Sequence, residues 1–263
     1  MKKILFIFML FFAIAITGCS SDDTPDGPIV IKEINLELVK CPAGTFMMGS
    51  PEGELARKND EKQHNVTLTK SFYISKFEVT QSQYEAIIGK NPSKFKGANN
   101  PVEMVSYEES KAFCDKLNTK YLSLLPKGYK FDLPAEAQWE YACRAGTNTR
   151  FNNGTDQNID EVAWYDKNAS DTTHVVGQKK PNAWGIYDMH GNVEEWCRYW
   201  YGEYPNENVK DPIGASSGSD RVNRGGGWDD GSYNCRSADR CRDNPSDVRS
   251  ERIGFRVAIV PVD

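Results

Sequence analysis

The chain has 263 residues, of which 39% are hydrophobic, and its formal net charge is −5 at pH 7. An acidic chain repels a polyanion, so the charge argues against nucleic acid as a partner. The length is large for one domain but fits a single irregular α+β unit.

The N-terminus has the organisation of a secretory signal. Two lysines are followed by an uncharged apolar run at 4–16 and then by Thr17-Gly18-Cys19. The run is too short to cross a bilayer as a helix. Its end resembles a bacterial lipobox, which implies that residues 1–18 are removed and that lipid is attached to Cys19. An ordinary signal peptide with a chance cysteine is the alternative. Loss of the two lysines would lower the net charge from −5 to −7.

A polar stretch with two prolines and a glycine follows at 22–28 and predicts a flexible tether over 19–30. The folded domain is then expected over 31–263. The acidic residues directly after Cys19 resemble the surface-export signal of some Gram-negative lipoproteins. We therefore expect an outer-membrane lipoprotein that is held in the membrane by its lipid and exposed on the cell surface. The periplasmic face is the alternative.

Strands are predicted in the first part of the domain. Alternating residues indicate a strand over 39–49, interrupted by a Pro-Ala-Gly turn, and a second strand over 66–69. A β-branched and aromatic run predicts a third strand over 72–80.

Three helices are predicted from their start signals. Thr80 and Gln83 form a capping pattern before a helix to about residue 88, and Ser106 and Glu109 repeat it before a helix to about residue 117. Pro134 suits the first turn of a third helix over 135–144. The stretch 146–224 then shows little periodicity, although it contains four tryptophans. Such a length without regular elements needs strong internal ties, such as buried indoles, disulfides or bound ions.

Nine motifs occur in the same order as in the formylglycine-generating enzyme (sulfatase-modifying factor) family, which the chain resembles over most of its mature length. The resemblance implies a C-type-lectin-like α+β fold with much irregular backbone. It rests on Arg224-Gly-Gly-Gly-Trp228 and on the segments at 42–49, 77–84, 100–106, 133–146, 176–177, 181–196, 235–238 and 253–257.

The copper site of the family's oxidases is not expected here. Those enzymes place two cysteines after the glycines, and soft thiolates are the ligands that Cu(I) prefers. In this chain the first position is Asp230 and the second falls within 232–234, which contains no cysteine. Copper binding is therefore not predicted. A shifted catalytic pair, Cys235 and Cys241, is the weaker alternative.

Six cysteines remain after Cys19, an even number that is compatible with disulfides in an exported chain. The resemblance implies a bridge between Cys143 and Cys235, because some family members have one at the corresponding positions. Cys197 with Cys241 is then a residual pairing. Cys41 and Cys114 are left open.

The resemblance also implies structural calcium. Many family members bind the ion at a Gly-Asn-Val-Trp-Glu turn, and residues 191–195 here read Gly-Asn-Val-Glu-Glu. The implied ligands are the side chains of Asn192 and Glu195 and the carbonyl of Val193, which are hard oxygen donors. A solvated Asn-Glu loop is the alternative.

The segment 228–252 is rich in Asp, Asn, Ser and Arg and resembles the variable segment of ligand-binding relatives of this fold. Adaptable polar residues with a few aromatic anchors are typical of binding surfaces. We predict a non-catalytic domain that binds a protein or a glycan. A divergent formylglycine-generating oxidase and a structural component of an envelope secretion or gliding machinery are the alternatives. The candidate ligand-binding residues are Trp228, Asp229, Asp230, Ser232, Tyr233 and Asn234.

Overall fold

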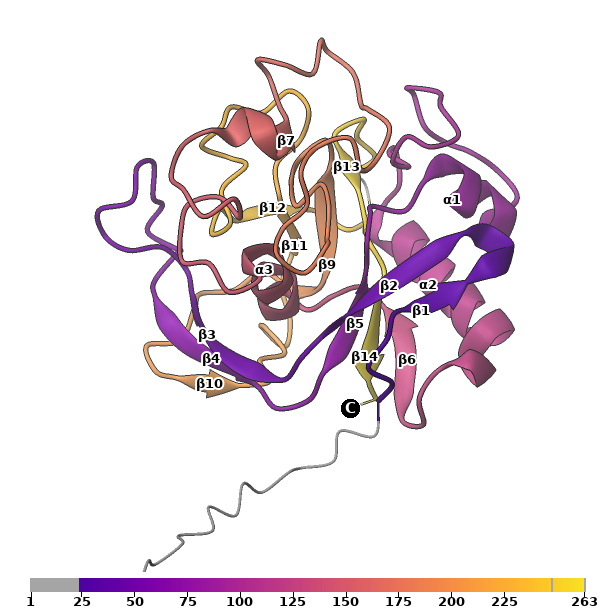
Figure 1. The fold of residues 1–263 in the computed structure, drawn as a ribbon, viewed down its shortest axis with the longest axis horizontal. Helices are drawn as coiled ribbons and strands as arrows, with labels where there is room; N and C mark the ends of the chain where they lie inside the picture. Colours follow the sequence, from indigo (N-terminus) through magenta and orange to yellow (C-terminus); the bar gives the residue numbers. More distant parts are fainter. Residues whose placement is uncertain (1–23, 247, 263) are drawn as a thin grey trace, which may run out of the picture.

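The computed structural model describes residues 24–246 and 248–262. The predicted signal, the lipid site at Cys19 and the first part of the tether lie outside this range. Within it, no helix is both long and apolar enough to cross a membrane. Helices and strands are mixed along the chain, which confirms the predicted α+β class (Figure 1).

A five-stranded antiparallel sheet joins the two ends of the domain. Its order is β1 (Ile29–Ile31), β2 (Leu36–Cys41), β5 (Phe72–Ser75), β14 (Ala258–Pro261) and β6 (Tyr129–Asp132). Helices α1 (Gln81–Ile88) and α2 (Tyr107–Tyr121) cover one face (Figure 1). Between sheet and helices lies the main core, in which Tyr84 stacks on Phe113 and Phe255 meets both rings edge-on.

The other half of the domain contains three smaller sheets around α3 (Glu136–Arg144). They are β10-β4-β3, β12-β11-β9-β13 and the pair β7-β8. Short 3-10 turns occur at Lys32–Ile34, Leu122–Leu124 and Ile159–Glu161. The strands are β3 (Gly44–Met48), β4 (His64–Leu68), β7 (Ala163–Trp164), β8 (His190–Gly191), β9 (Glu194–Trp200), β10 (Val209–Lys210), β11 (Arg221–Arg224), β12 (Cys241–Asp243) and β13 (Ile253–Gly254).

The predicted helix starts are confirmed. Both capping boxes are complete: the Thr80 hydroxyl accepts a hydrogen bond from the backbone of Gln83, whose side chain accepts one from the Thr80 N–H, and Ser106 and Glu109 repeat the pattern. Helix α2 continues to residue 121, four residues beyond the prediction.

Two strand predictions need correction. The predicted strand over 72–80 ends at Ser75, because the chain bends at residues 76–77 after a last bond in register, from the Lys76 N–H to the Glu37 carbonyl of β2. The seven-residue strand β9 was missed, because it lies within the stretch predicted to be irregular. Its first four residues are all buried, so no polar alternation marks it.

Buried arginines tie the irregular half together. Arg224, Arg236 and Arg256 are among the largest fully buried side chains. The Arg256 guanidinium donates to both carboxylate oxygens of Glu195 at 2.6 and 2.7 Å, and to the carbonyls of Ser75 and Tyr187 at 3.0 Å each. The Arg256 side chain therefore links β9, β5 and the segment before β8 through its hydrogen bonds.

We expect Arg256→Met to lower the free energy of unfolding by about 3–5 kcal/mol, because Glu195 would be left buried without its partner. Urea denaturation at neutral pH measures this. The matched control is Arg242→Met, since Arg242 is more than half exposed and lies 4.0 Å from Asp220. Its loss should cost less than about 1 kcal/mol. Equal effects of the two substitutions would contradict the structural role of Arg256.

Candidate functional site

The candidate ligand-binding loop begins at the glycines that follow β11. Gly225 and Gly226 have φ values of +98° and +71°, a region that residues with a Cβ rarely adopt. A Cβ on Gly226 would also lie 2.7 Å from the sulfur of Cys235. The glycines therefore fix the turn that starts the loop.

Three of the six predicted ligand-binding residues make contacts that stabilise the loop. Trp228 is buried, donates its indole N–H to the Glu251 carbonyl at 3.0 Å and meets the Phe95 ring edge-on. Asp230 accepts hydrogen bonds from the Gly227 N–H and the Asn234 side-chain amide, each at 2.8 Å. These contacts make Trp228, Asp230 and Asn234 parts of the framework.

The other predicted residues reach the surface. The side chain of Tyr233 is 54% exposed, Asp229 is exposed and Ser232 is half-buried. The Asp229 carboxylate lies 3.2 Å from Nε of Arg252. An aromatic ring, a hydroxyl and a carboxylate are thus presented together on a loop that is held rigidly from beneath.

Arg252 stands among several carboxylates at the base of the loop. Its Nη2 lies 2.9 Å from Glu194 and 3.3 Å from Asp230. Burial, together with the negative charge of Asp230, raises the pKa of Glu194 to about 8. One guanidinium therefore does not neutralise the whole group, and Glu194 changes its charge near neutral pH.

The weak catalytic alternative places two thiols in different environments. Cys235 is fully buried in a small cluster with Phe151 and Tyr165. Cys241 lies on β12, where its S–H points to Asp239. Burial and the nearby carboxylates raise the thiol pKa of both cysteines. Burial and nearby negative charge therefore disfavour the thiolate form of both cysteines, which Cu(I) binding would need.

The predicted disulfides are not formed, since all six cysteines in the described part of the chain are free thiols. This corrects the pairings of Cys143 with Cys235 and of Cys197 with Cys241. The ring of His190 takes the place of the first bridge: its Nδ1–H donates to the Cys235 carbonyl at 2.7 Å, and its Nε2 lies 3.7 Å from the Cys143 sulfur. Burial lowers the pKa of His190 to about 4, so the ring is neutral.

The residues predicted to bind calcium lie together, but their side-chain oxygens already have protein partners. Both oxygens of Glu195 bind Arg256, and one also accepts from the Trp139 indole N–H at 2.6 Å. The Asn192 side-chain oxygen accepts from the His174 N–H at 2.9 Å. In this arrangement the side-chain oxygens of Asn192 and Glu195 are engaged by protein donors, and calcium binding by these two residues and Val193 stays a prediction. Among the described residues, no group of three or more His, Cys, Asp or Glu is placed to hold a metal.

The sequence did not identify two buried acids beside this turn. Glu78 accepts from the Asn192 amide at 2.8 Å and the Val193 N–H at 3.2 Å, and Asp188 accepts from the Gly177 N–H at 2.6 Å. Burial raises the pKa of both carboxyls, to about 6 for Asp188. Glu78 belongs to one of the family-like motifs, which is the only sequence signal that points to it.

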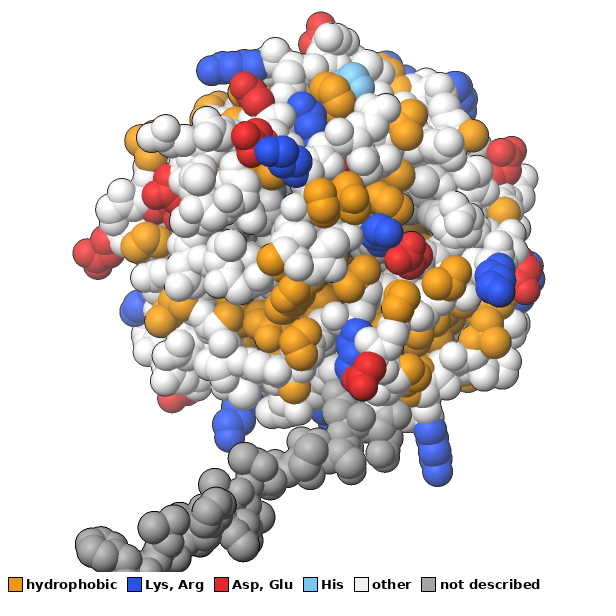
Figure 2. Space-filling model, in the orientation of Figure 1, with side chains coloured by type: hydrophobic (Ala, Val, Ile, Leu, Met, Phe, Trp, Pro, Cys, Tyr) orange, Lys and Arg blue, Asp and Glu red, His pale blue; other side chains and the backbone are white. Residues whose placement is uncertain are grey.

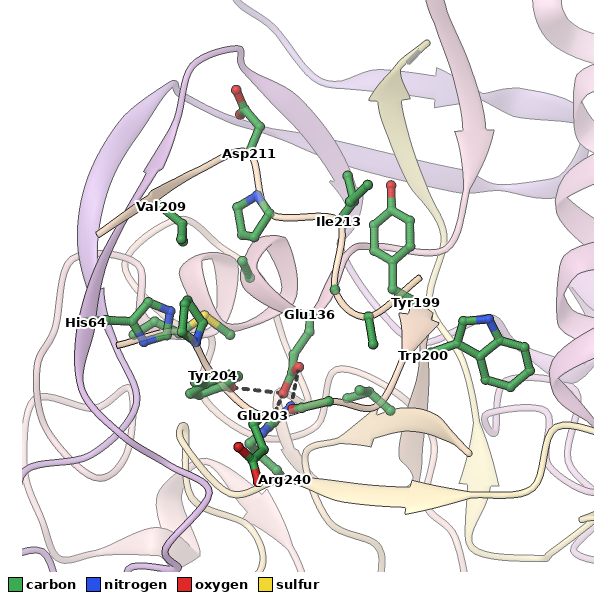
Figure 3. A pocket seen from close by; sticks show the side chains of 18 of the residues that line it. His64, Glu136, Tyr199, Trp200, Glu203, Tyr204, Val209, Asp211, Ile213 and Arg240 are labelled. Atoms are coloured by element: carbon green, nitrogen blue, oxygen red, sulfur yellow. Dashed lines mark hydrogen bonds and ion pairs between the residues drawn. The ribbon is translucent and has the colours of Figure 1, made fainter. Parts of the chain in front are cut away.

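A hollow of about 530 Å³ lies away from the predicted site, between β3, β4, the start of α3 and the segment 199–215 (Figure 3). Its volume is in the range of small-ligand sites. At its floor, Tyr204 donates to Glu136 at 2.9 Å and Arg240 pairs with the same carboxylate at 2.6 Å. Burial opposes ionisation of Glu136, yet Arg240 and Arg224 hold its pKa below the usual value. None of the predicted site residues lines this hollow, although Met48, Glu136 and Ala137 belong to the family-like motifs at 42–49 and 133–146.

The model of the sulfatase-modifying factor enzyme 1-like domain matches residues 32–260. The chain belongs to this family. It is 32% identical to the chaperone protein LppX of Paenibacillus barcinonensis, over 87% of this chain and 89% of the relative. It is 25% identical to the formylglycine-generating enzyme of Mus musculus, over 84% of this chain and 74% of that protein.

The fold has a close match among solved structures. The Treponema denticola variable protein 1 superposes with a TM-score of 0.80 and 29% identity, over 89% of this chain and 98% of that protein. Together with the family match, this confirms the family and the fold class that the motifs predicted.

Glu194 gives the domain a testable pH dependence. Its pKa in the folded state, about 8, lies above the ordinary value of 4.5, so the folded protein binds this proton more tightly than the unfolded chain does. The stabilisation that comes from tighter binding of the Glu194 proton in the folded state is complete below about pH 4.5 and is lost as the pH rises to about 8. We expect the urea midpoint to fall between pH 5 and pH 9, and Glu194→Gln to reduce the fall. Exposed Glu207→Gln is the control, and an unchanged slope in Glu194→Gln would refute the assignment.

Calcium removal tests the turn at 191–195. We expect a chelator to leave Tm unchanged, because Arg256 already neutralises Glu195. Differential scanning calorimetry with EGTA and with added calcium measures this. A Tm that rises with calcium concentration would show binding to the folded state and would restore the predicted ligand set.

Proposed function

We propose that the protein is an exported lipoprotein of the outer membrane whose domain binds a protein partner and catalyses no reaction. The lipid at Cys19 holds it in the membrane, on the cell surface or, as the alternative, on the periplasmic face. Recognition uses the loop 228–234, through Asp229, Ser232 and Tyr233.

The observation that carries the proposal is the role of Asp230. At the position where the family's oxidases have a copper-binding thiol, this chain has a carboxylate that accepts two hydrogen bonds and lies beside Arg252. A hard, internally bonded carboxylate cannot replace a soft thiolate as a Cu(I) ligand. The framework of the site is retained while the residues of the oxidation chemistry are absent.

Two further points favour a protein as the ligand. A rigidly supported loop that exposes a tyrosine beside a carboxylate has the composition of protein-recognition sites, where tyrosine supplies contact area at low entropic cost. The relative LppX is named a chaperone, and a chaperone binds proteins. A glycan ligand is the alternative for the same loop.

The second candidate function is a divergent formylglycine-generating oxidase, favoured by the relationship to the mouse enzyme. A third, a structural component of an envelope secretion or gliding machinery, would show itself as stable co-purification with envelope proteins.

The oxidase alternative has a direct test. The purified protein, supplied with Cu(I) and oxygen, is incubated with a Cys-x-Pro-x-Arg peptide, and the aldehyde product is measured by mass spectrometry. We expect no more product than with the Cys235→Ser/Cys241→Ser variant. Product that depends on these thiols would overturn the non-catalytic proposal.

Site-specific photo-crosslinking tests the binding proposal. A benzophenone amino acid at position 233 is expected to yield a discrete protein adduct in the native envelope. The same probe at Val30, which is 45% exposed on β1, is the control and should not form this adduct. The substitution Asp229→Arg should reduce the adduct, since it reverses the charge of a proposed contact. An adduct of equal yield from both positions would reject the loop as the binding surface.

A further inference from the structure

The first described residues are fixed to one edge of the domain. The hydroxyls of Thr24 and Ser71 lie 2.8 Å apart, and the Tyr73 hydroxyl donates to the Pro25 carbonyl at 2.6 Å. Ser71 belongs to the turn between β4 and β5, so the chain enters the fold at this turn.

The proposed lipid is close to the same point in the sequence. Cys19 precedes Thr24 by five residues, which span about 17 Å even when fully extended. The inference that follows rests on the proposed lipid anchor. With that anchor, the edge around Ser71 cannot be farther from the headgroups than this short length allows.

Several surface residues share this edge. The Tyr129 hydroxyl donates to the Ser71 carbonyl at 3.1 Å, and the Val262 N–H donates to the Gly128 carbonyl at 2.7 Å. In Figure 1 the first described residues, in indigo, lie beside the C-terminus and the turn that leads into β6. We call the following set the anchor face: Lys70, Leu122, Leu124, Lys127, Ile213 and Val262.

The apolar members of the anchor face are unusually exposed. Leu122, Leu124, Ile213 and Val262 are 50%, 53%, 60% and 52% exposed. Ile213 and Val262 also line one shallow hollow together with Lys70. These four are among the nine large hydrophobic side chains that are exposed in the described part of the chain. Leu122 and Leu124 belong to the 3-10 turn just before Gly128, whose carbonyl accepts from the Val262 N–H, so this segment leads to the same edge.

The charge of the anchor face is opposite to that of the whole chain. Lys70 and Lys127 are exposed, and neither forms an ion pair with any residue that the structure describes. The acids nearby are already engaged: Asp132 pairs with Lys111, Lys130 and Arg198, and Asp211 binds Thr69. Asp26, which follows Pro25 and is exposed, pairs with Lys40 at 3.0 Å. Figure 2 shows basic side chains projecting from the lower edge of the molecule.

We propose that the anchor face lies directly on an anionic lipid surface. Lysines beside exposed leucines match such a surface, because the lysines attract acidic headgroups while the apolar side chains enter the boundary of the acyl region. The lipid at Cys19 supplies the first attachment and the anchor face the second, which is the combination that stable anchoring requires. The bilayer thereby fixes the orientation of the domain as well as its location.

Hydrogen exchange of the full-length lipidated protein tests this proposal. The protein is placed in vesicles of phosphatidylcholine alone, in vesicles that also contain phosphatidylglycerol, and in detergent. We expect amides at 69–71 and 122–129 to exchange more slowly in the anionic vesicles, while those at 228–234 are unchanged. In Lys70→Glu/Lys127→Glu the slowing should fall by about tenfold or more, since each lysine contributes roughly fivefold to binding at an anionic surface.

The matched control is Lys96→Glu/Lys167→Glu, which changes the charge equally elsewhere. Both lysines are exposed and lie near the loop: Phe95 contacts Trp228, and the Asp166 N–H donates to the Asp230 carbonyl. This control should retain the full protection. Leu122→Ser/Leu124→Ser tests the apolar contribution and should reduce the protection without a change of charge.

The outcomes separate this inference from the proposed anchor. Protein that carries lipid and stays on the vesicles, but shows no protection at the anchor face, overturns the inference and leaves the anchor intact. If the full-length protein proves to carry no lipid and leaves the vesicles, both the proposed anchor and this inference are overturned. Protection that is equal in both kinds of vesicle and grows with protein density indicates contact between copies, and also overturns the proposal.

Discussion

The fold depends on a buried ion pair between Arg256 and Glu195. The two residues are held at 2.6–2.7 Å with no access to water, and the remaining donors of the guanidinium reach backbone carbonyls of two other segments. Carbonyls outside a sheet or helix need a donor when they are buried. An arginine with five donors in a fixed plane can satisfy several of them at once. This is how a long stretch with little secondary structure is held in one conformation.

The same solution recurs through the irregular half. Arg224 pairs with Glu140 of α3, and Arg236 pairs with Glu61 at 2.6 Å in the loop that follows β3. Such pairs contribute little net stability compared with apolar packing, yet the loss of one partner is severe, because a buried charge is then left alone. They therefore specify which segments meet. In this chain they take the place that disulfides and bound ions were predicted to fill.

The arginines also explain why two site predictions do not fit the observed contacts. Glu195 was predicted to bind calcium, but Arg256 donates to both of its oxygens. Cys143 and Cys235 have positions near one another, but the imidazole of His190 binds between them. In each case the predicted residue is where the family motif placed it, and a neighbour from a distant part of the chain determines its role.

Sequence reasoning therefore succeeded where the relevant partners are close along the chain. The capping boxes of α1 and α2 involve residues three positions apart, and both were predicted. The partners of Arg256 lie 61, 69 and 181 positions away, so no local pattern could indicate them. Strand β9 was missed for a related reason, because burial of its first residues on both sides removes the alternation by which strands are recognised. The residues at 228–234 were named from the sequence as candidate ligand-binding residues, but the division between buried Trp228 and exposed Tyr233 emerges only once the fold supplies Phe95 and Glu251.

The arrangement of the two ends gives the proposed function a consistent geometry. The loop 228–234 packs on the segment around Asp166, whereas the first described residue, Thr24, contacts Ser71. In Figure 1 the loops that follow β11 lie at the end of the domain away from these first described residues. A domain on a tether of a few residues cannot turn freely, so a recognition surface beside the anchor would face lipid and be blocked. Because the loop is at the far end, the proposed lipid anchor at Cys19 would direct it away from the membrane. The buried arginines keep the loop rigid at that distance, and the replacement of the oxidase thiols by Asp230 leaves this rigidity intact.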